Sequence, residues 1–176
     1  NEVFFDDVEV PYENLIGEEN KGWDYAKFLL GNERTGIARV GVSKERLRRI
    51  RALASKVESG GRPVIEDPAF REKLTACEIE LKALELTQLR VVADEGKHGK
   101  GKPNPASSVL KIKGSEIQQT TTELLMEIIG PFAAPYDEHG DAGSNESMDW
   151  TAQIAPSYFN NRKVSIYGGS NEIQRN

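Results

Sequence analysis

One carboxylate, Glu33, occupies a position where the sequence pattern predicts an apolar side chain. At about 100° per residue it falls on the face of a helix whose other members are apolar. Those members recur at steps of three and four, or their sums: Ala26, Leu30, Ile37 and Val40. Burial disfavours the charged form and raises a carboxyl pKa, which suits a general base near neutral pH. A structural ion pair with a neighbouring Arg or Lys explains the same pattern, so periodicity leaves both interpretations open.

A glycine turn near the C-terminus is the second candidate for chemistry. The sequence there reads Tyr167-Gly168-Gly169-Ser170. Two glycines permit positive φ and let the backbone come close to a flat ligand. The N–H groups at the start of a following helix can hold a partial negative charge. Taken alone, the same residues are also expected in an ordinary turn between helices.

The remaining reactive side chains predict no further site. Cys77 is the only cysteine, lies in a helical pattern and is expected to be a small buried apolar side chain. His98 and His139 stand in loops without metal-ligand spacing, so no metal is predicted. The basic residues between 44 and 51 read as a solvated helix face, with contact to a CoA phosphate or a partner as the alternative.

Composition favours a helical domain that acts on neither nucleic acid nor membranes. Of 176 residues, 38% are apolar and 29% charged, and the formal net charge is −5. No apolar run approaches the roughly 20 residues that span a bilayer. A single cysteine fits a reducing cytoplasm. The opening Asn-Glu-Val-Phe-Phe has no initiator Met, so we expect a fragment of a longer chain.

The expected fold is all-α, an antiparallel four-helix bundle preceded by a short extended segment. Residues 1–21 would be the end of a preceding β-domain and a connector, and residues 22–176 the helical domain. Asp67-Pro68 is a helix start, with Asp as the cap and Pro at the first position. The expected helices span 22 to about 57 (ended by Gly60-Gly61), 68 to about 96, about 105 to 129, and about 151 to 165, with a fifth capped by Ser170 or Asn171. Long loops are expected at 96–103 and 130–150.

The terminal string from Ile166 to Asn176 is similar to the C-terminal signature of the acyl-CoA dehydrogenases. The resemblance extends over nearly the whole chain. The opening Val3–Pro11 looks like that family's exit from its middle β-domain, and Gly17–Gly22 looks like the connector into the first helix. The stretch from Leu110 to Gly130 resembles the third helix.

This resemblance implies an FAD-dependent dehydrogenation of an acyl-CoA thioester between its α and β carbons. In much of the family the base is a Glu in the turn, where this chain has Gly168. In the isovaleryl and long-chain branch the base lies on the first helix, at the position of Glu33, followed by Arg34 as here. By the same resemblance, the Gly168 N–H would bind the thioester oxygen. Gly169 and Ser170 would lie near the flavin or its phosphates. Arg34 would orient Glu33 or contribute to the surroundings of the flavin, with a structural salt bridge as the alternative.

Two departures from the family concern the FAD site at a subunit interface. The usual Arg-x-x-Phe-Gly after the first helix is replaced by Gly60-Gly61-Arg62-Pro63-Val64, where Arg62 could still reach a pyrophosphate. The usual Gln and Gly-Gly ending the third helix are replaced by Glu127 and Gly130-Pro131. These departures resemble the pimeloyl-CoA dehydrogenase and sterol side-chain branches, in which some members form mixed tetramers with fewer flavins than subunits.

The resemblance also implies partners: the acyl-CoA substrate, an electron-transfer flavoprotein, and further subunits in a homo- or hetero-oligomer, either dimer or tetramer. The alternative function is a non-catalytic partner subunit or helical oligomerisation module of a mixed complex. A related flavin monooxygenase on the same scaffold is a third possibility, which the acid at position 33 disfavours. The 176 residues alone are not expected to catalyse a reaction.

Overall fold

The computed structural model describes residues 2–33, 36–98, 105–133, 151 and 153–176, without the side chains of residues 30–33 and 95–98. Helices dominate this part of the chain, and the only strands within it are two strands of two residues each that form an antiparallel hairpin. The hairpin strands are β1 (Glu58–Ser59) and β2 (Arg62–Pro63). The α-helices are α1 (Gly22–Glu33), α2 (Val40–Ala54), α3 (Pro68–His98), α4 (Ala106–Ile129), α5 (Ile154–Asn160) and α6 (Asn171–Arg175).

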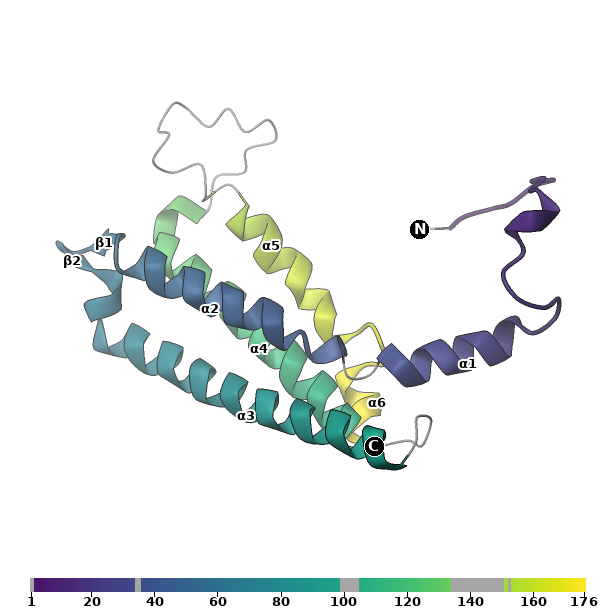
Figure 1. The fold of residues 1–176 in the computed structure, drawn as a ribbon. Coiled ribbons are helices and arrows are strands. Elements are labelled where there is room, and N and C mark those ends of the chain that lie inside the picture. The colour runs from purple at the N-terminus through teal and green to yellow at the C-terminus, as the bar shows by residue number, and fades with distance from the viewer. Residues whose placement is uncertain (1, 34–35, 99–104, 134–150, 152) are drawn as a thin grey trace.

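Helices α2, α3, α4 and α5 run side by side in alternating directions, with α6 packed near one end of α4 (Figure 1). The expected all-α antiparallel bundle is therefore confirmed. Its core is built from apolar side chains of α2, α3 and α4, since α4 contacts every other member. The largest fully buried ones are Phe70, Ile50, Leu74, Leu110, Ile117 and Leu124.

The expected single helix from residue 22 to about 57 is wrong, because the chain forms two helices there. Between them lie a 3-10 turn, η2 (Gly36–Ala38), and Arg39 in the left-handed region with φ 47° and ψ 39°. An L-residue in that region cannot continue a right-handed helix. The angular argument that placed Glu33 on one face with Ile37 and Val40 therefore fails across this break. Glu33 is the last residue of α1, and its side chain lies outside the described part.

The helix predicted to start at Asp67-Pro68 forms as expected. The Asp67 side chain accepts hydrogen bonds from the N–H groups of Ala69 at 2.7 Å and Phe70 at 3.3 Å. Helix α4 ends where Gly130 takes a φ of 57°. Most of the loops predicted at 96–103 and 130–150 lie outside the described residues, which omit 99–104 and 134–150.

The segment predicted as one helix from about 151 to 165 contains a shorter α-helix and then a 3-10 helix. The α-helix is α5, and the 3-10 helix is η6 (Asn161–Ser165), in which the helical turn tightens. Ser170 then caps α6 as predicted, since its side chain accepts from the N–H of Ile173.

Helix α1 and the residues before it project away from the bundle (Figure 1). Their large apolar side chains are exposed: Phe5 to 79%, Ile16 to 90% and Trp23 to 70%. So many exposed large apolar side chains in one segment are unusual for a free-standing domain. Within the described ranges, no helix combines the length and the apolar character that crossing a bilayer requires.

Candidate functional site

The turn at Gly168 and Gly169 requires residues without a side chain. Both have positive φ, 68° and 83°. A Cβ placed on Gly168 would lie 2.5 Å from Cδ1 of Ile37, the middle residue of η2. Gly168 itself is exposed, so a ligand can reach its backbone from outside the bundle. The glycine turn and the segment that follows α1 are therefore in direct contact.

Two side chains of α6 and its cap close the turn from its C-terminal side. The Gln174 side-chain amide donates to the carbonyl oxygen of Gly168 at 3.2 Å. The Ser170 hydroxyl accepts from the Ile173 N–H at 3.4 Å and hydrogen-bonds the Glu172 carboxylate. The backbone and hydroxyl hydrogen bonds hold the pKa of Glu172 below its usual value. Ser170 thus serves the helix start, and its side chain is already engaged within the chain.

A buried polar cluster under the turn joins it to α4. The Lys111 ammonium donates to the Ser165 carbonyl oxygen at 2.9 Å and to Oδ1 of Asn171 at 2.7 Å. The Asn171 amide donates to Oγ of Ser115 at 3.0 Å, and that hydroxyl donates to the Ile112 carbonyl at 2.7 Å. Lys111, Ser115 and Asn171 are all buried. The cluster therefore fixes the chain on both sides of the glycine turn.

Helix α4 also holds η2 close through a glycine. A Cβ on Gly114 would lie 2.6 Å from the Cα of Ala38 and 2.7 Å from its carbonyl oxygen, which are backbone atoms that cannot move aside. The backbones of α4 and η2 thus approach each other directly at this point. As a result, η2 lies against both α4 and the glycine turn.

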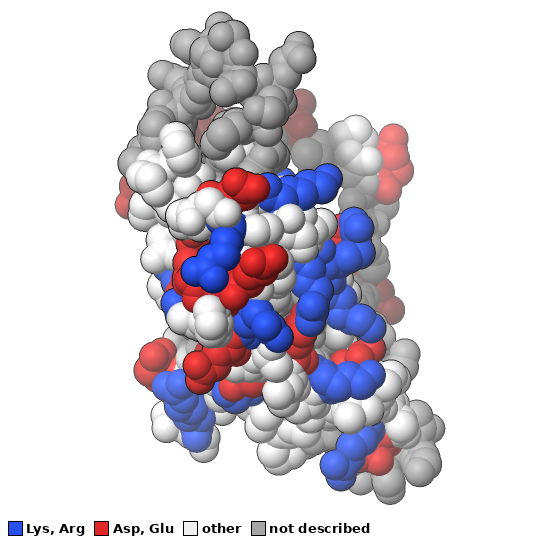
Figure 2. Space-filling model, turned by 90° about the vertical axis from the view of Figure 1, so that its left-hand side faces the viewer, with Lys and Arg blue, Asp and Glu red and all other residues white. Residues whose placement is uncertain are grey.

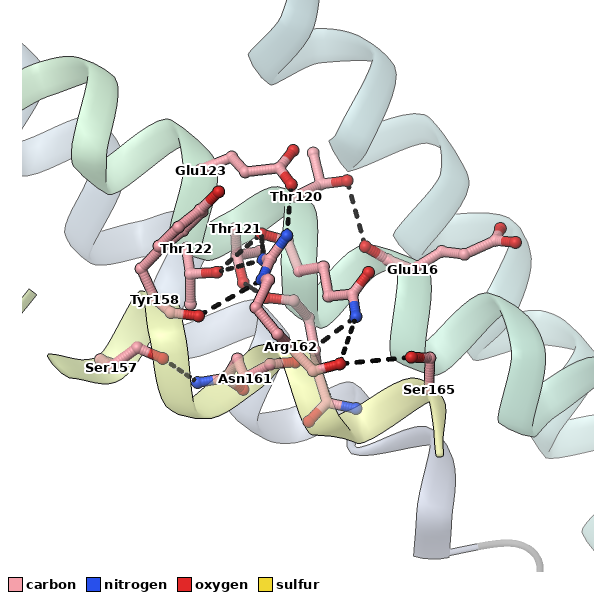
Figure 3. Close-up of polar contacts among 12 residues, drawn as sticks. Glu116, Thr120, Thr121, Thr122, Glu123, Ser157, Tyr158, Asn161, Arg162 and Ser165 are labelled. Carbon is pink, nitrogen blue, oxygen red and sulfur yellow. Dashed lines mark hydrogen bonds and ion pairs between the residues drawn. The ribbon is translucent and has the colours of Figure 1, made fainter. Parts of the chain in front are cut away.

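Arg162 fastens the segment that precedes the turn. Its guanidinium reaches from η6 to α4, where it pairs with Glu123 at 2.7 Å and donates to Oγ1 of Thr122 at 3.1 Å (Figure 3). Its carbon Cζ also lies 4.3 Å from the centre of the Tyr158 ring, a cation–π contact. The Gln119 side chain returns a hydrogen bond to the Arg162 carbonyl. These contacts fix where the chain enters the turn.

The predicted site residues divide into those that the structure brings together and those that it does not. Gly168, Gly169 and Ser170 form one turn against η2. Arg34 lies outside the described residues, as does the side chain of Glu33. Arg62 is on the hairpin, in a hollow of about 270 Å³ whose other charged walls are Glu66, Asp67 and Glu127.

Sequence reasoning missed several residues that position the turn. Ile37 was read as part of a helix face, and Lys111 was read only as part of the resemblance. Gly114 and Asn171 gave no signal for a close backbone approach or a buried polar contact, because both depend on which segments meet in three dimensions.

The other reactive groups behave as ordinary structural side chains. Burial raises the pKa of the Cys77 thiol to about 11, assisted by the charges of Glu80 and Glu78. The thiol is therefore protonated at neutral pH, which supports its prediction as a small buried side chain. Among the described side chains, no group of His, Cys, Asp or Glu comes together in a way that could hold a metal ion.

The basic residues of α2 are largely neutralised by carboxylates. Lys44 pairs with Glu85 at 2.8 Å and Arg51 pairs with Glu78, both across to α3. Figure 2 shows acidic and basic side chains interspersed over the end of the molecule that carries the hairpin. The exposed ion pairs support the prediction of a solvated helix face. Arg46 differs, since it is half-buried and donates to Asn161 at 3.4 Å, and burial lowers its pKa.

The model of the acyl-CoA dehydrogenase C-terminal domain matches residues 20–176, which include the glycine turn and the helices around it. The chain belongs to the acyl-CoA dehydrogenase family. Acyl-CoA dehydrogenase IpdE1 of Mycobacterium tuberculosis is 30% identical over 177 residues, covering 100% of this chain and 41% of that protein. The mitochondrial long-chain specific acyl-CoA dehydrogenase of Sus scrofa is 30% identical over 179 residues, covering 99% of this chain and 37% of its own length.

Solved structures of acyl-CoA dehydrogenase-like chains share the fold. The ChsE4-ChsE5 complex of Mycobacterium tuberculosis contains a chain that matches with a TM-score of 0.68 and 25% identity, over 98% of this chain and 42% of that one. The present chain thus spans about two-fifths of the length of the relatives it matches.

Proposed function

We propose that this chain is the C-terminal domain of an FAD-dependent acyl-CoA dehydrogenase, with Glu33 as the base. The observation that carries the proposal is the contact between Gly168 and Ile37, which joins the glycine turn to the segment directly after α1. Glu33 precedes Ile37 by four residues, so their Cα atoms lie within about 15 Å of each other. This short separation along the chain supports the assignment of the base to position 33.

The glycine at position 168 supports the same assignment. A side chain there would meet Ile37 and would require a left-handed backbone that L-residues avoid. The turn itself supplies no carboxylate, because position 168 is a glycine, so a base has to come from another element. This favours the isovaleryl and long-chain type of arrangement, with the base on the first helix.

The proposed division of labour follows from these positions. The Glu33 carboxylate takes the proton from the α carbon while a hydride leaves the β carbon, and the α–β double bond forms. The thioester oxygen gains negative charge as the proton leaves, and the Gly168 N–H donates to it. A fixed donor of this kind stabilises the transition state more than the ground state, because the charge develops during the step.

The residues present fit the flavin only in part. The backbone of Gly168 is exposed and carries no side chain, which suits the approach of the edge of a flat ring. When bound, FAD supplies the acceptor for the hydride that leaves the β carbon. Arg62 fits less well, because the acidic side chains around it disfavour a pyrophosphate. Further walls of the site would come from the rest of the longer chain, in which residues 1–21 connect a β-domain to the bundle.

We further propose that the protein works as an oligomer and passes its electrons to an electron-transfer flavoprotein. The outer face of α3 carries an exposed stripe at heptad spacing, made of Ala76, Ile79, Ala83 and Leu86. A hollow of about 470 Å³ lies along the N-terminal half of that stripe. An exposed seam of this kind suits packing against a helix of another subunit.

A non-catalytic partner subunit is the second candidate function, and the acidic surroundings of Arg62 favour it. The two candidate functions predict different flavin absorbance for the purified protein. Full-length protein that is purified alone and carries a flavin spectrum supports the dehydrogenase. Protein that becomes yellow only with a second, related subunit supports the partner role.

The base assignment is tested by Glu33→Gln in the full-length protein, assayed with acyl-CoA and an artificial electron acceptor. We expect turnover to fall by at least about 100-fold, since general base catalysis typically contributes about 10²–10⁴-fold. The control is Glu58→Gln, which removes an exposed carboxylate of the hairpin and should leave turnover unchanged. Undiminished turnover in Glu33→Gln would eliminate Glu33 as the base.

A further inference from the structure

We propose that Lys111 is a positioning residue that holds the Gly168–Gly169 turn in the geometry needed to bind the substrate oxygen. This inference rests on the proposed function. It assigns to α4 a part in the reaction, although no atom of Lys111 need touch substrate or cofactor.

The first observation is that Lys111 keeps its ammonium in an unusual place. The residue is 3% exposed, and burial lowers its pKa. Within the described part of the chain, no carboxylate lies at ion-pair distance from it, and the charge of Glu172 acts on it only as a secondary influence. Burial of a charged group is costly unless the group is well hydrogen-bonded. The two bonds that it makes are therefore expected to be firm.

The second observation is where those two bonds go. One reaches the carbonyl oxygen of Ser165 at 2.9 Å, before the turn, and the other reaches Oδ1 of Asn171 at 2.7 Å, after it. A single ammonium thus bridges the two ends of the segment that contains Gly168 and Gly169. Hydrogen bonds to a charged donor are about twice as strong as neutral ones.

The third observation is that the acceptor on α6 is itself fixed. The Asn171 amide donates to Ser115 on α4 at 3.0 Å, which sets its oxygen toward Lys111. Asn171 is 7% exposed, so water is a poor substitute for these contacts. The turn contains two glycines with positive φ and therefore has little stiffness of its own. Its shape must therefore come from the hydrogen bonds of Lys111 to Ser165 and Asn171 at its two ends.

The test compares Lys111→Met with wild type in the full-length protein, because Met replaces the aliphatic part of the lysine side chain and lacks the ammonium. We expect kcat to fall about 10- to 100-fold with KM changed less than about threefold, since a misplaced oxyanion donor costs about 10²–10³-fold when lost altogether. Amide hydrogen exchange at Ile166 and Gln174, whose N–H groups are hydrogen-bonded on either side of the turn, should speed up at least about tenfold. The matched control is Lys163→Met, on the exposed side of η6, which should change neither.

Asn171→Ala removes the side chain that accepts the second hydrogen bond of Lys111, and it replaces Lys111→Met in the test if that variant does not fold. It should give the same loss of kcat and the same faster exchange. Unchanged exchange, or faster exchange with unchanged kcat, would overturn the positioning role. The exchange measurement does not require catalysis. If the wild-type protein had no dehydrogenase activity, the proposed function would be refuted, but hydrogen exchange would still test whether Lys111 holds the turn.

Discussion

Two features of the structure disfavour a Cβ atom at position 168. The φ of Gly168, 68°, penalises any L-residue, and a Cβ would stand 2.5 Å from Cδ1 of Ile37. Sequence reasoning could propose the turn from two adjacent glycines and could place Ser170 as a helix cap, because both are local properties. The contact with Ile37 could not be predicted, since it depends on how η2 folds back against the C-terminal segment.

We expect Gly168→Ala to destabilise the protein by roughly 2–4 kcal/mol, from overpacking and from the left-handed backbone. Ile37→Val removes the colliding Cδ1, so the double variant should regain the steric part and keep the backbone penalty. Denaturant unfolding midpoints of the two single variants and the double variant measure this. Strictly additive effects would show that Ile37 does not oppose a side chain at 168.

The Cys77 thiol should be inert in the native protein. Its pKa of about 11 leaves roughly one thiolate in 10³ at pH 8, and its burial blocks access. Alkylation by iodoacetamide, followed by mass spectrometry, should be at least about 100-fold slower than in denaturant. Equally fast labelling in both states would show that the α3 core is open.

At the scale of elements, local signals predicted α3 well because Asp67-Pro68 caps it and its apolar pattern continues unbroken. The break between α1 and α2 was missed for a different reason. A periodic pattern reports which residues are apolar, and a 3-10 turn followed by one left-handed residue can leave such a pattern nearly intact. Gly36 begins η2 within this break and Gly41 follows the first residue of α2, and both lower helix propensity.

Gly114 is where α4 and η2 meet, so a substitution there should be more disruptive than one on an open glycine. Gly114→Ala forces its methyl against backbone atoms of Ala38 and should cost about 1–3 kcal/mol. The control is Gly41→Ala in α2, where no atom lies within 4 Å of the added methyl. That variant should gain about 0.5–1 kcal/mol from helix propensity. Unfolding midpoints that change alike in both variants would contradict the close approach of η2 to α4.

At the scale of the whole molecule, the bundle leaves two kinds of apolar surface exposed. Helix α1 and the residues before it suit the rest of a longer chain, which is consistent with relatives more than twice as long. The outer stripe of α3 suits another subunit. Sequence reasoning already assigned residues 1–21 to a connection with another domain. It could not find the stripe on α3, because a pattern of apolar residues cannot distinguish a face that covers the core from one that packs against a partner.

Association of two copies of the chain through α3 would bring oppositely charged side chains together. If two copies pack antiparallel about residue 81, Glu72 of one faces Arg90 of the other, since 81 − 72 and 90 − 81 are both 9. Both side chains are exposed. Glu72→Arg alone should shift the full-length protein toward smaller species in sedimentation velocity, and adding Arg90→Glu should restore assembly. Unchanged assembly in the single variant would exclude this pairing.

The glycine turn and the carboxylate at position 33 are together proposed to dehydrogenate an acyl-CoA. Titration of the full-length flavoprotein with a panel of acyl-CoA thioesters, without oxygen, tests this claim most directly. At least one thioester should bleach the oxidised-flavin absorbance in wild type and fail to do so in Glu33→Gln. A fully loaded wild-type flavoprotein that no acyl-CoA bleaches, or a Glu33→Gln variant that bleaches at the wild-type rate, would contradict the claim.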